Sequence, residues 1–221
     1  MAIVSTAKFS DTIEADRLDA EFFEPKDLEI LNKLRQAGGS TLGEICDVLN
    51  GKTPTEYIAD GDVPVVRSGD LSAPLIYPDC GRDFLRTQRS EKLVRLVTGD
   101  VLISSIGLGS IGKISLVMDA GDFVTVSEVT ILRSRKYPSE VLFTYLTTEA
   151  GQRQILRQVT GATGQQHLLR SKVEMILVPP APKRDIVDAI RASCARAWDL
   201  EKDVSKQHIK THEIFANSLG L

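Results

Sequence analysis

The stretch from residue 183 to residue 218 contains neither glycine nor proline, and it follows the proline cluster Pro179-Pro180-Ala181-Pro182. Because glycine and proline are the usual helix breakers, this stretch is predicted to form one unbroken helix. At 1.5 Å per residue such a helix spans roughly 50 Å. A single domain offers little surface of that length, which favours a helix that projects and pairs with a partner. An amphipathic helix packed on its own domain is the alternative.

Apolar side chains along this stretch recur with alternating spacings of four and three residues, a pattern typical of a coiled coil. Polar residues such as Ser193 and Gln207 fall in the same row, so only about half of the row is apolar. We expect this row to form a dimer contact. Its proposed contact residues are Ile186, Ile190, Ala197, Leu200, Val204 and Ile214.

Composition divides the chain into a segment with a short helix (1–38), a central domain (39–182) and the long helix (183–221). The first segment carries eight acidic and five basic residues, and Pro25 suits the first turn of a helix that ends at Gln36, before Gly38-Gly39.

The central domain alternates short β-rich runs with two helical patterns. Helices are predicted over 139–146, with Ser139 as the N-cap, and over 149–159. The predicted fold is therefore of the α/β class (mixed α+β), with a mixed and partly irregular sheet followed by the long helix. The expected strands cover 63–66, 101–103, 114–117, 123–126, 129–132 and 175–178.

Charge and apolar content exclude several classes of protein. The net charge of −3 and the pI of about 5.7 argue against a polybasic DNA coat. No apolar run approaches the ~18 residues of a membrane span, and the N-terminus lacks a signal-peptide pattern. The three cysteines Cys46, Cys80 and Cys194 are far apart, which indicates reduced thiols in a cytoplasmic protein.

The segment 107–113, Gly-Leu-Gly-Ser-Ile-Gly-Lys, matches two nucleotide-binding patterns only superficially. A P-loop needs Ser or Thr directly after its lysine, where this chain has Ile114, and both patterns need a following helix. The residues after Lys113 indicate a strand instead. We therefore interpret the segment as a glycine-rich turn between two strands, with Lys113 available to a phosphate.

The sequence contains no recognisable catalytic constellation. The only Pro-Asp pair, at 78–79, is not followed by an acidic residue with a lysine two positions on, as one nuclease class requires. His208 and His212 lie one helical turn apart but lack the glutamate of a metalloprotease pattern. No catalytic residue, metal site or cofactor of its own is predicted for this chain.

Basic residues form clusters within the central domain, although such clusters are more often solvated surfaces than DNA sites. Arginine can recognise guanine, glutamine can recognise adenine, and lysine or arginine can bind phosphates. The candidate DNA-binding residues are Arg82, Arg86, Arg89, Lys92, Lys113, Arg133, Arg135, Lys136, Gln165, Gln166 and His167.

The order of several motifs resembles the specificity subunits of type I restriction–modification systems. In this family the proline cluster usually continues into Glu-Gln, whereas here Lys183-Arg184-Asp185 follows. The complete subunits carry two target recognition domains, and this chain has one, so it resembles a half-length form. The matching stretches are Arg17–Pro25, Gly51–Pro54, Val63–Leu71, Gly99–Ser104, the turn at 107–112, Gly161–Gln165 and Val178–Pro182.

The resemblance implies a non-catalytic DNA-binding subunit that recognises half of a split target. Its expected partners are double-stranded DNA, a methyltransferase subunit that brings S-adenosylmethionine, and an ATP-dependent restriction subunit. A homodimer through the long helices would recognise a palindromic split site. The alternatives are a regulatory module that contacts a methyltransferase without recognising DNA, a detached recognition domain of a fused methyltransferase–nuclease and, last, an enzyme.

Overall fold

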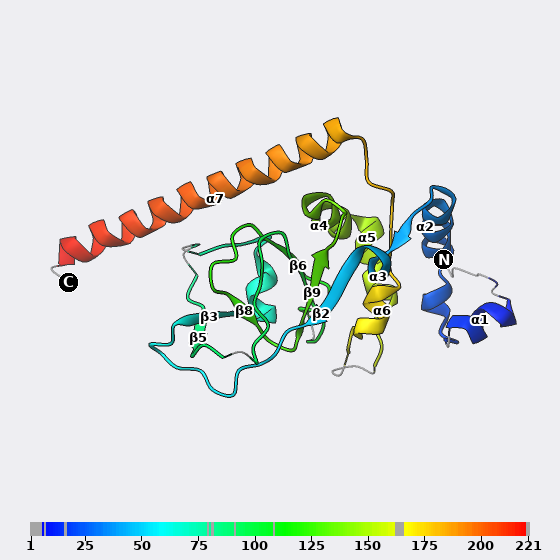
Figure 1. The fold of residues 1–221 in the computed structure, drawn as a ribbon, viewed down its shortest axis with the longest axis horizontal. Helices are drawn as coiled ribbons and strands as arrows, with labels where there is room; N and C mark the ends of the chain where they lie inside the picture. Colours follow the sequence, from blue (N-terminus) through cyan, green and yellow to red (C-terminus); the bar gives the residue numbers. More distant parts are fainter. Residues whose placement is uncertain are drawn as a thin grey trace.

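The structure is a computed structural model of this chain. It describes residues 6, 8–15, 17–78, 80, 82–90, 92–107, 109–161 and 166–219. Figure 1 shows a mixed α/β domain beneath one long helix, with the N-terminal helices at the end of the molecule far from the C-terminus. The helices are α1 (Phe9–Ala15), η1 (Ala20–Phe23), α2 (Pro25–Gln36), α3 (Leu42–Ile45), η2 (Ser68–Ser72), α4 (Ser139–Thr147), α5 (Glu149–Arg157), α6 (Arg170–Glu174) and α7 (Arg184–Leu219). The strands are β1 (Ser40–Thr41), β2 (Cys46–Asn50), β3 (Val63–Val66), β4 (Leu75–Ile76), β5 (Leu85–Thr87), β6 (Val101–Ser104), β7 (Ile114–Val117), β8 (Val124–Thr125), β9 (Val129–Ser134) and β10 (Leu177–Val178).

A five-stranded sheet in the order β2-β9-β6-β7-β4 forms the centre of the domain. The first four strands alternate in direction, and β4 runs parallel to β7. In this register Leu102 on β6 lies opposite Ile131 on β9, and Val48 on β2 lies opposite Leu132. All residues of β6 and β7 are buried, which explains why these strands appear in the sequence as short apolar runs without polar alternation.

Apolar side chains cover both faces of this sheet. On one face Leu132 belongs to a cluster with Leu142 of α4 and Ile155 of α5. On the other face Ile131 belongs to a second cluster with Phe123, which precedes β8. Helices α4 and α5 therefore cover one face of the central sheet, and the sheet that contains β3 and β8 covers the other.

Two smaller sheets complete the domain. One has the order β5-β3-β8, in which β3 is antiparallel to β5 and parallel to β8. The other pairs β1 with β10, so that Ser40 lies opposite Val178. This pairing joins the start of the central domain to its end. The division at residues 38 and 182 stays a prediction.

The sequence predicts most of the longer elements correctly. The helix expected from Pro25 to Gln36 is confirmed as α2, and strands form in all six expected regions. The N-cap of α4, however, is Pro138, and Ser139 is the first helical residue. Met175 follows α6 and does not join the last strand. The sequence pattern does not predict β2, β4 or β5, which are short or partly polar.

The N-terminal segment packs on the central domain through arginines of α5. Arg153 forms ion pairs with Glu24 and Asp27. The Arg157 guanidinium lies 3.5 Å from the centroid of the Phe22 ring, and burial lowers the pKa of this arginine to about 10. The acidic first segment thus lies against the two arginines of α5, the first part of a stretch of the sequence, 151–173, that contains no acidic residue.

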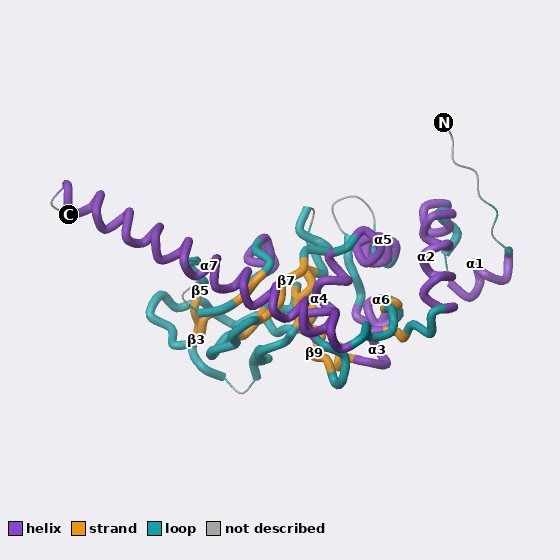
Figure 2. Tube along the Cα trace, turned by 90° about the horizontal axis from the view of Figure 1, so that it is seen from above, coloured by secondary structure: helices purple, strands orange, loops and turns teal. Residues whose placement is uncertain are grey.

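One face of α7 packs along the domain (Figures 1 and 2). Val187 is buried, the Trp198 ring meets the Tyr77 ring edge-on at 6.0 Å between centroids, and Ser205 Oγ donates to the Cys80 carbonyl at 3.3 Å. The expectation that this helix projects from its own domain is therefore wrong. The alternative, an amphipathic helix packed on its own domain, describes this face. The packed side chains lie on a different face from most of the row expected at a dimer contact.

A second face of α7 is exposed. Exposure is 47% for Ile186, 54% for Leu200 and 64% for Val204, and Ala197 is also exposed. Ile190 differs because it is half-buried. Together with Ile186 and Ala197 it lines a groove of about 650 Å³ beside α4. The side chain of Ile214 lies outside the described side chains. Within the described part of the chain, no helix has the length and apolar character needed to cross a membrane.

Candidate nucleic-acid interface

Four neighbouring strands place their connecting segments at one edge of the five-stranded sheet. Because β2, β9, β6 and β7 alternate in direction, β2 and β6 end at this edge, and β9 and β7 begin there. The residues that follow or precede these strand ends include Gly51, Ser105, Lys113 and Glu128. We call this the loop edge of the sheet.

Close backbone packing joins two segments at the loop edge. Gly51 N donates to Val129 O at 3.0 Å, and Lys52 N donates to Thr125 O at 2.9 Å. A Cβ atom at Gly51 would lie 2.1 Å from Val126 O and 2.7 Å from Thr125 O. Glycine is therefore required at this position by the approach of another backbone.

Gly51→Ala is expected to lower the free energy of unfolding by about 1–3 kcal/mol, because the added methyl group forces two backbones apart. Urea denaturation of the two proteins measures this difference. Gly69→Ala is the control, because a Cβ atom there would meet no atom within 4 Å. Equal stability of the Gly51 variant and the parent would contradict the packing described above.

Residues near 167 are tied to the same edge. Ile106 and Thr160 each form a β-bridge with His167, and Leu168 N donates to Ser105 O at 2.8 Å. His167 itself is exposed. Gln166 is half-buried and lines a cavity that also includes Arg157, whereas Gln165 lies outside the described residues.

The glycine-rich segment is confirmed as a turn between β6 and β7. Gly107, Gly109 and Gly112 have φ values of +110°, +76° and +82°, which glycine adopts without strain. A strand follows Lys113 directly, so the helix required by both nucleotide-binding patterns is not formed. Lys113 lines a cavity of about 330 Å³ that α5 also lines through Gln152.

The arginines between residues 82 and 89 already bind groups of the domain itself. Arg82 donates to the carbonyl oxygens of Asp70 and Leu75. Arg86 donates to the backbone oxygens of Gly61 and Asp62. Arg89 pairs with the carboxylates of Asp62 and Asp122. Each of these side chains thus makes two contacts within the domain and keeps further N–H donors for a ligand.

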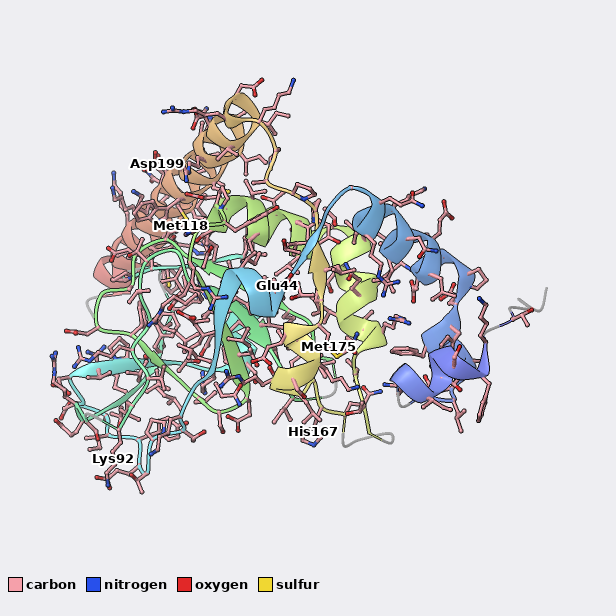
Figure 3. All side chains as sticks on the ribbon, turned by 45° about the vertical axis from the view of Figure 1, so that its right-hand side comes forward. Glu44, Lys92, Met118, His167, Met175 and Asp199 are labelled. Atoms are coloured by element: carbon pink, nitrogen blue, oxygen red, sulfur yellow. The ribbon has the colours of Figure 1, made fainter. Side chains whose placement is uncertain are left out.

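Lys92 differs from these arginines because it is exposed and its ammonium group has no ion-pair partner among the described residues. Figure 3 shows Lys92 and His167 on the side of the molecule opposite Asp199 of α7. Both are therefore available to a ligand that approaches the domain away from the long helix.

The basic residues from 133 to 136 lie at the other edge of the sheet, where β9 ends. Arg133 makes a bidentate contact of 2.9 and 3.0 Å with Asp100, whose side chain is fully buried. Arg135 pairs with Asp47 at 2.8 Å and donates to two carbonyl groups of α3. Lys136 is exposed beside the start of α4. Arg133, Arg135 and Lys136 therefore lie at the opposite edge of the sheet from Lys113, and the structure does not bring them together with it.

Lys52 is a cation at the loop edge that the charge clusters do not reveal, because it stands alone in the sequence. It is exposed, and no described carboxylate pairs with it. The signal that could identify it is the motif Gly51-Lys52-Thr53-Pro54, in which the glycine is required by backbone packing. Among the described residues, no three His, Cys, Asp or Glu side chains gather to hold a metal ion.

A family model described as "Type I restriction modification DNA specificity domain" matches residues 39–209, which is well over half of the chain. The matched region includes the central domain and most of α7. No curated protein matches the chain.

Solved structures show a similar fold. The type I restriction–modification S subunit from M. genitalium aligns with a TM-score of 0.58 and 14% identity, covering 82% of this chain and 45% of that one. A structure described under "complex assembly and conformational transition of the type I R-M system" aligns with a TM-score of 0.52 and 17% identity, covering 94% and 53%. The chain thus spans about half the length of these structures.

Proposed function

The chain belongs to the family of type I restriction–modification DNA specificity domains, and on this premise we propose that it recognises one half of a split DNA target. The family match over residues 39–209 is the observation that carries this proposal. The domain supplies the specificity, and its partners supply the chemistry. We propose no catalytic activity for this chain.

The proposed DNA-binding surface is the loop edge together with Lys92, which lies on the same side of the molecule as His167 (Figure 3). Lys52 and Lys92 are exposed, and Lys113 is partly so, and none has an ion-pair partner among the described residues. Such lysines suit phosphate groups, whereas Gln166 and His167 offer groups that can form hydrogen bonds with base edges. Because part of the acidity of the chain lies in the N-terminal segment against α5, the net charge of −3 does not oppose binding at this edge.

The partners follow from the family. We propose a methyltransferase subunit, which would bring S-adenosylmethionine, and an ATP-dependent restriction subunit as further members of the complex. Since this chain has the length of about half of the structures it resembles, we propose that two copies together recognise both halves of the target.

The exposed face of α7 supports the pairing of two copies. Ile186, Leu200 and Val204 are each about half exposed or more, and Ala197 lies in the same row. An apolar row of this kind loses water contact when two helices pack together. The groove of about 650 Å³ beside α4 gives room for side chains of a second helix.

Lys92→Ala is expected to weaken binding to all DNA sequences alike and to reduce the slope of log K against log salt by about 1, because one phosphate contact is lost. Binding titrations over a range of salt concentrations measure both quantities. Lys136→Ala is the matched control, because Lys136 is also exposed but lies at the opposite edge of the sheet. An unchanged salt slope for Lys92→Ala would remove this residue from the interface.

The proposed function as a whole is tested by expressing the chain together with a methyltransferase subunit of this family and sequencing the methylated sites. The expected result is a symmetric split motif. Complex formation without binding to any DNA would instead favour the regulatory module that contacts a methyltransferase.

A further inference from the structure

The turn between β8 and β9 places a carboxylate at the loop edge. Val129 N donates to Val126 O at 3.1 Å, so that Ser127 and Glu128 are the two central residues of the turn. Ser127 is exposed and Glu128 is half-buried. The carboxylate therefore lies at the same edge as Lys52, close to the surface.

Two hydroxyl groups hold one oxygen of this carboxylate. Ser127 Oγ and Thr53 Oγ1 donate to Glu128 Oε2 at 3.1 and 3.3 Å. The two hydroxyl oxygens are 2.8 Å apart, and Thr53 Oγ1 also accepts a hydrogen bond from Ser127 N at 3.1 Å. Since Thr53 follows β2, these contacts fix the turn against a distant part of the chain.

The backbone of the turn is fixed on its other side as well. Ser105 N donates to Glu128 O at 2.8 Å, and Leu168 N donates to Ser105 O at 2.8 Å. Glu128 is thereby connected to the segment that carries His167. A carboxylate held in this way loses little further freedom when it binds a ligand.

The second oxygen, Glu128 Oε1, has no hydrogen-bond partner in the part of the chain that the structure describes, and no described lysine or arginine forms an ion pair with this carboxylate. DNA phosphates repel a carboxylate that has no cationic partner. A hydrogen-bond donor on the edge of a base can offset this repulsion. In the major groove cytosine and adenine present amino groups, N4 and N6, whereas guanine O6 and thymine O4 are acceptors. Adenine also presents the acceptor N7 beside its amino group, which disfavours a carboxylate, so cytosine is the base that suits Glu128 best.

We propose that Glu128 is a specificity-determining residue that accepts a hydrogen bond from the N4 amino group of a cytosine in the major groove. The proposal rests on the proposed DNA-binding function and adds to it the chemical group that is recognised. Thr53 is a positioning residue, because it contacts the carboxylate and would not touch the base.

Selection from a pool of random DNA duplexes tests the proposal, using the full chain in complex with a methyltransferase subunit. The parent is expected to require cytosine at one position of its motif. Glu128→Gln is expected to lose about tenfold or more of this preference and to accept adenine there, because glutamine pairs with adenine through two hydrogen bonds. Overall affinity is expected to persist, since the variant removes a negative charge.

Two controls separate recognition from other effects. Glu29→Gln removes the same charge from an exposed carboxylate on α2 that is paired with Lys33, and it is expected to leave the motif unchanged. Thr53→Val is expected to lower the preference at the same position as Glu128→Gln, and Thr53→Ser is expected to restore it. Serine keeps the hydroxyl group of Thr53 but lacks its methyl group. If the preference depended on the methyl group, Thr53→Ser would therefore lose it as well.

The outcomes distinguish the two proposals. Sequence-specific binding with the same motif for Glu128→Gln and the parent would overturn the role of Glu128 and leave the proposed function intact. Failure of the parent complex to bind any DNA would overturn the proposed function, and the role of Glu128 with it. Changes at several positions at once would overturn direct recognition and indicate a disturbed fold.

Discussion

Arg133→Ala is expected to lower the free energy of unfolding by about 3–5 kcal/mol, because it leaves a buried carboxylate without its charged partner and with only the Val97 N–H still bonded to it. Arg133 binds both oxygens of Asp100, and Asp100 is fully buried at the start of β6. The contact and the coulombic attraction of this carboxylate raise the pKa of Arg133. Denaturation in urea, followed by circular dichroism, measures the loss.

Lys136→Ala serves as the matched control for this prediction. Lys136 lies three residues away in the same basic cluster, but it is exposed, so its removal is expected to change stability by about 0.5 kcal/mol at most. If Arg133→Ala were as stable as the parent and instead lost affinity for DNA, the structural role assigned to Arg133 would be wrong.

Leu200→Glu is expected to convert a dimer of this chain into a monomer. A carboxylate at the centre of an apolar helix contact is buried without a partner, at a cost of several kcal/mol, which raises the dissociation constant by about a hundredfold or more. Sedimentation equilibrium of the full chain measures this change. Because the Leu200 side chain is 54% exposed in the single chain, the fold itself is expected to persist, as circular dichroism would verify.

Ala192→Glu is the control for the dimer. This position is also exposed on α7, but at 100° per residue it lies about 80° around the helix from Leu200 and outside the apolar row. The same charge at this position is expected to leave the dimer intact. Two results would exclude pairing through the exposed row: a parent chain that is monomeric at high concentration, or a Leu200→Glu variant that still dimerises.

The sequence predicts elements whose signal is local. The unbroken α7, the bounds of α2 and the strand Ile114–Val117 follow from helix breakers, from a first-turn proline and from an apolar run. β5 (Leu85–Thr87) escapes prediction because two of its three residues are exposed. Strand β2 escapes for a related reason, since Asp47 and Asn50 are exposed positions that obscure the apolar pattern.

The candidate interface could be predicted only in part. Charge and residue type predict Lys92 and His167, and both are exposed. The same criteria predict Arg82 and Arg133, although the structure shows both bonded to groups within the domain. An arginine has the same side chain in either role, so only its neighbours in space distinguish them.

From the sequence, then, follow the longer helices, the apolar strands and the resemblance to a half-length specificity subunit. The folded chain, by contrast, reveals that one face of α7 packs on the domain while another stays exposed. It also brings Thr53 into contact with Glu128, 75 residues further along the chain. Helix and strand propensities act over a few residues, whereas the pairing of a charge or hydroxyl depends on which distant strands become neighbours.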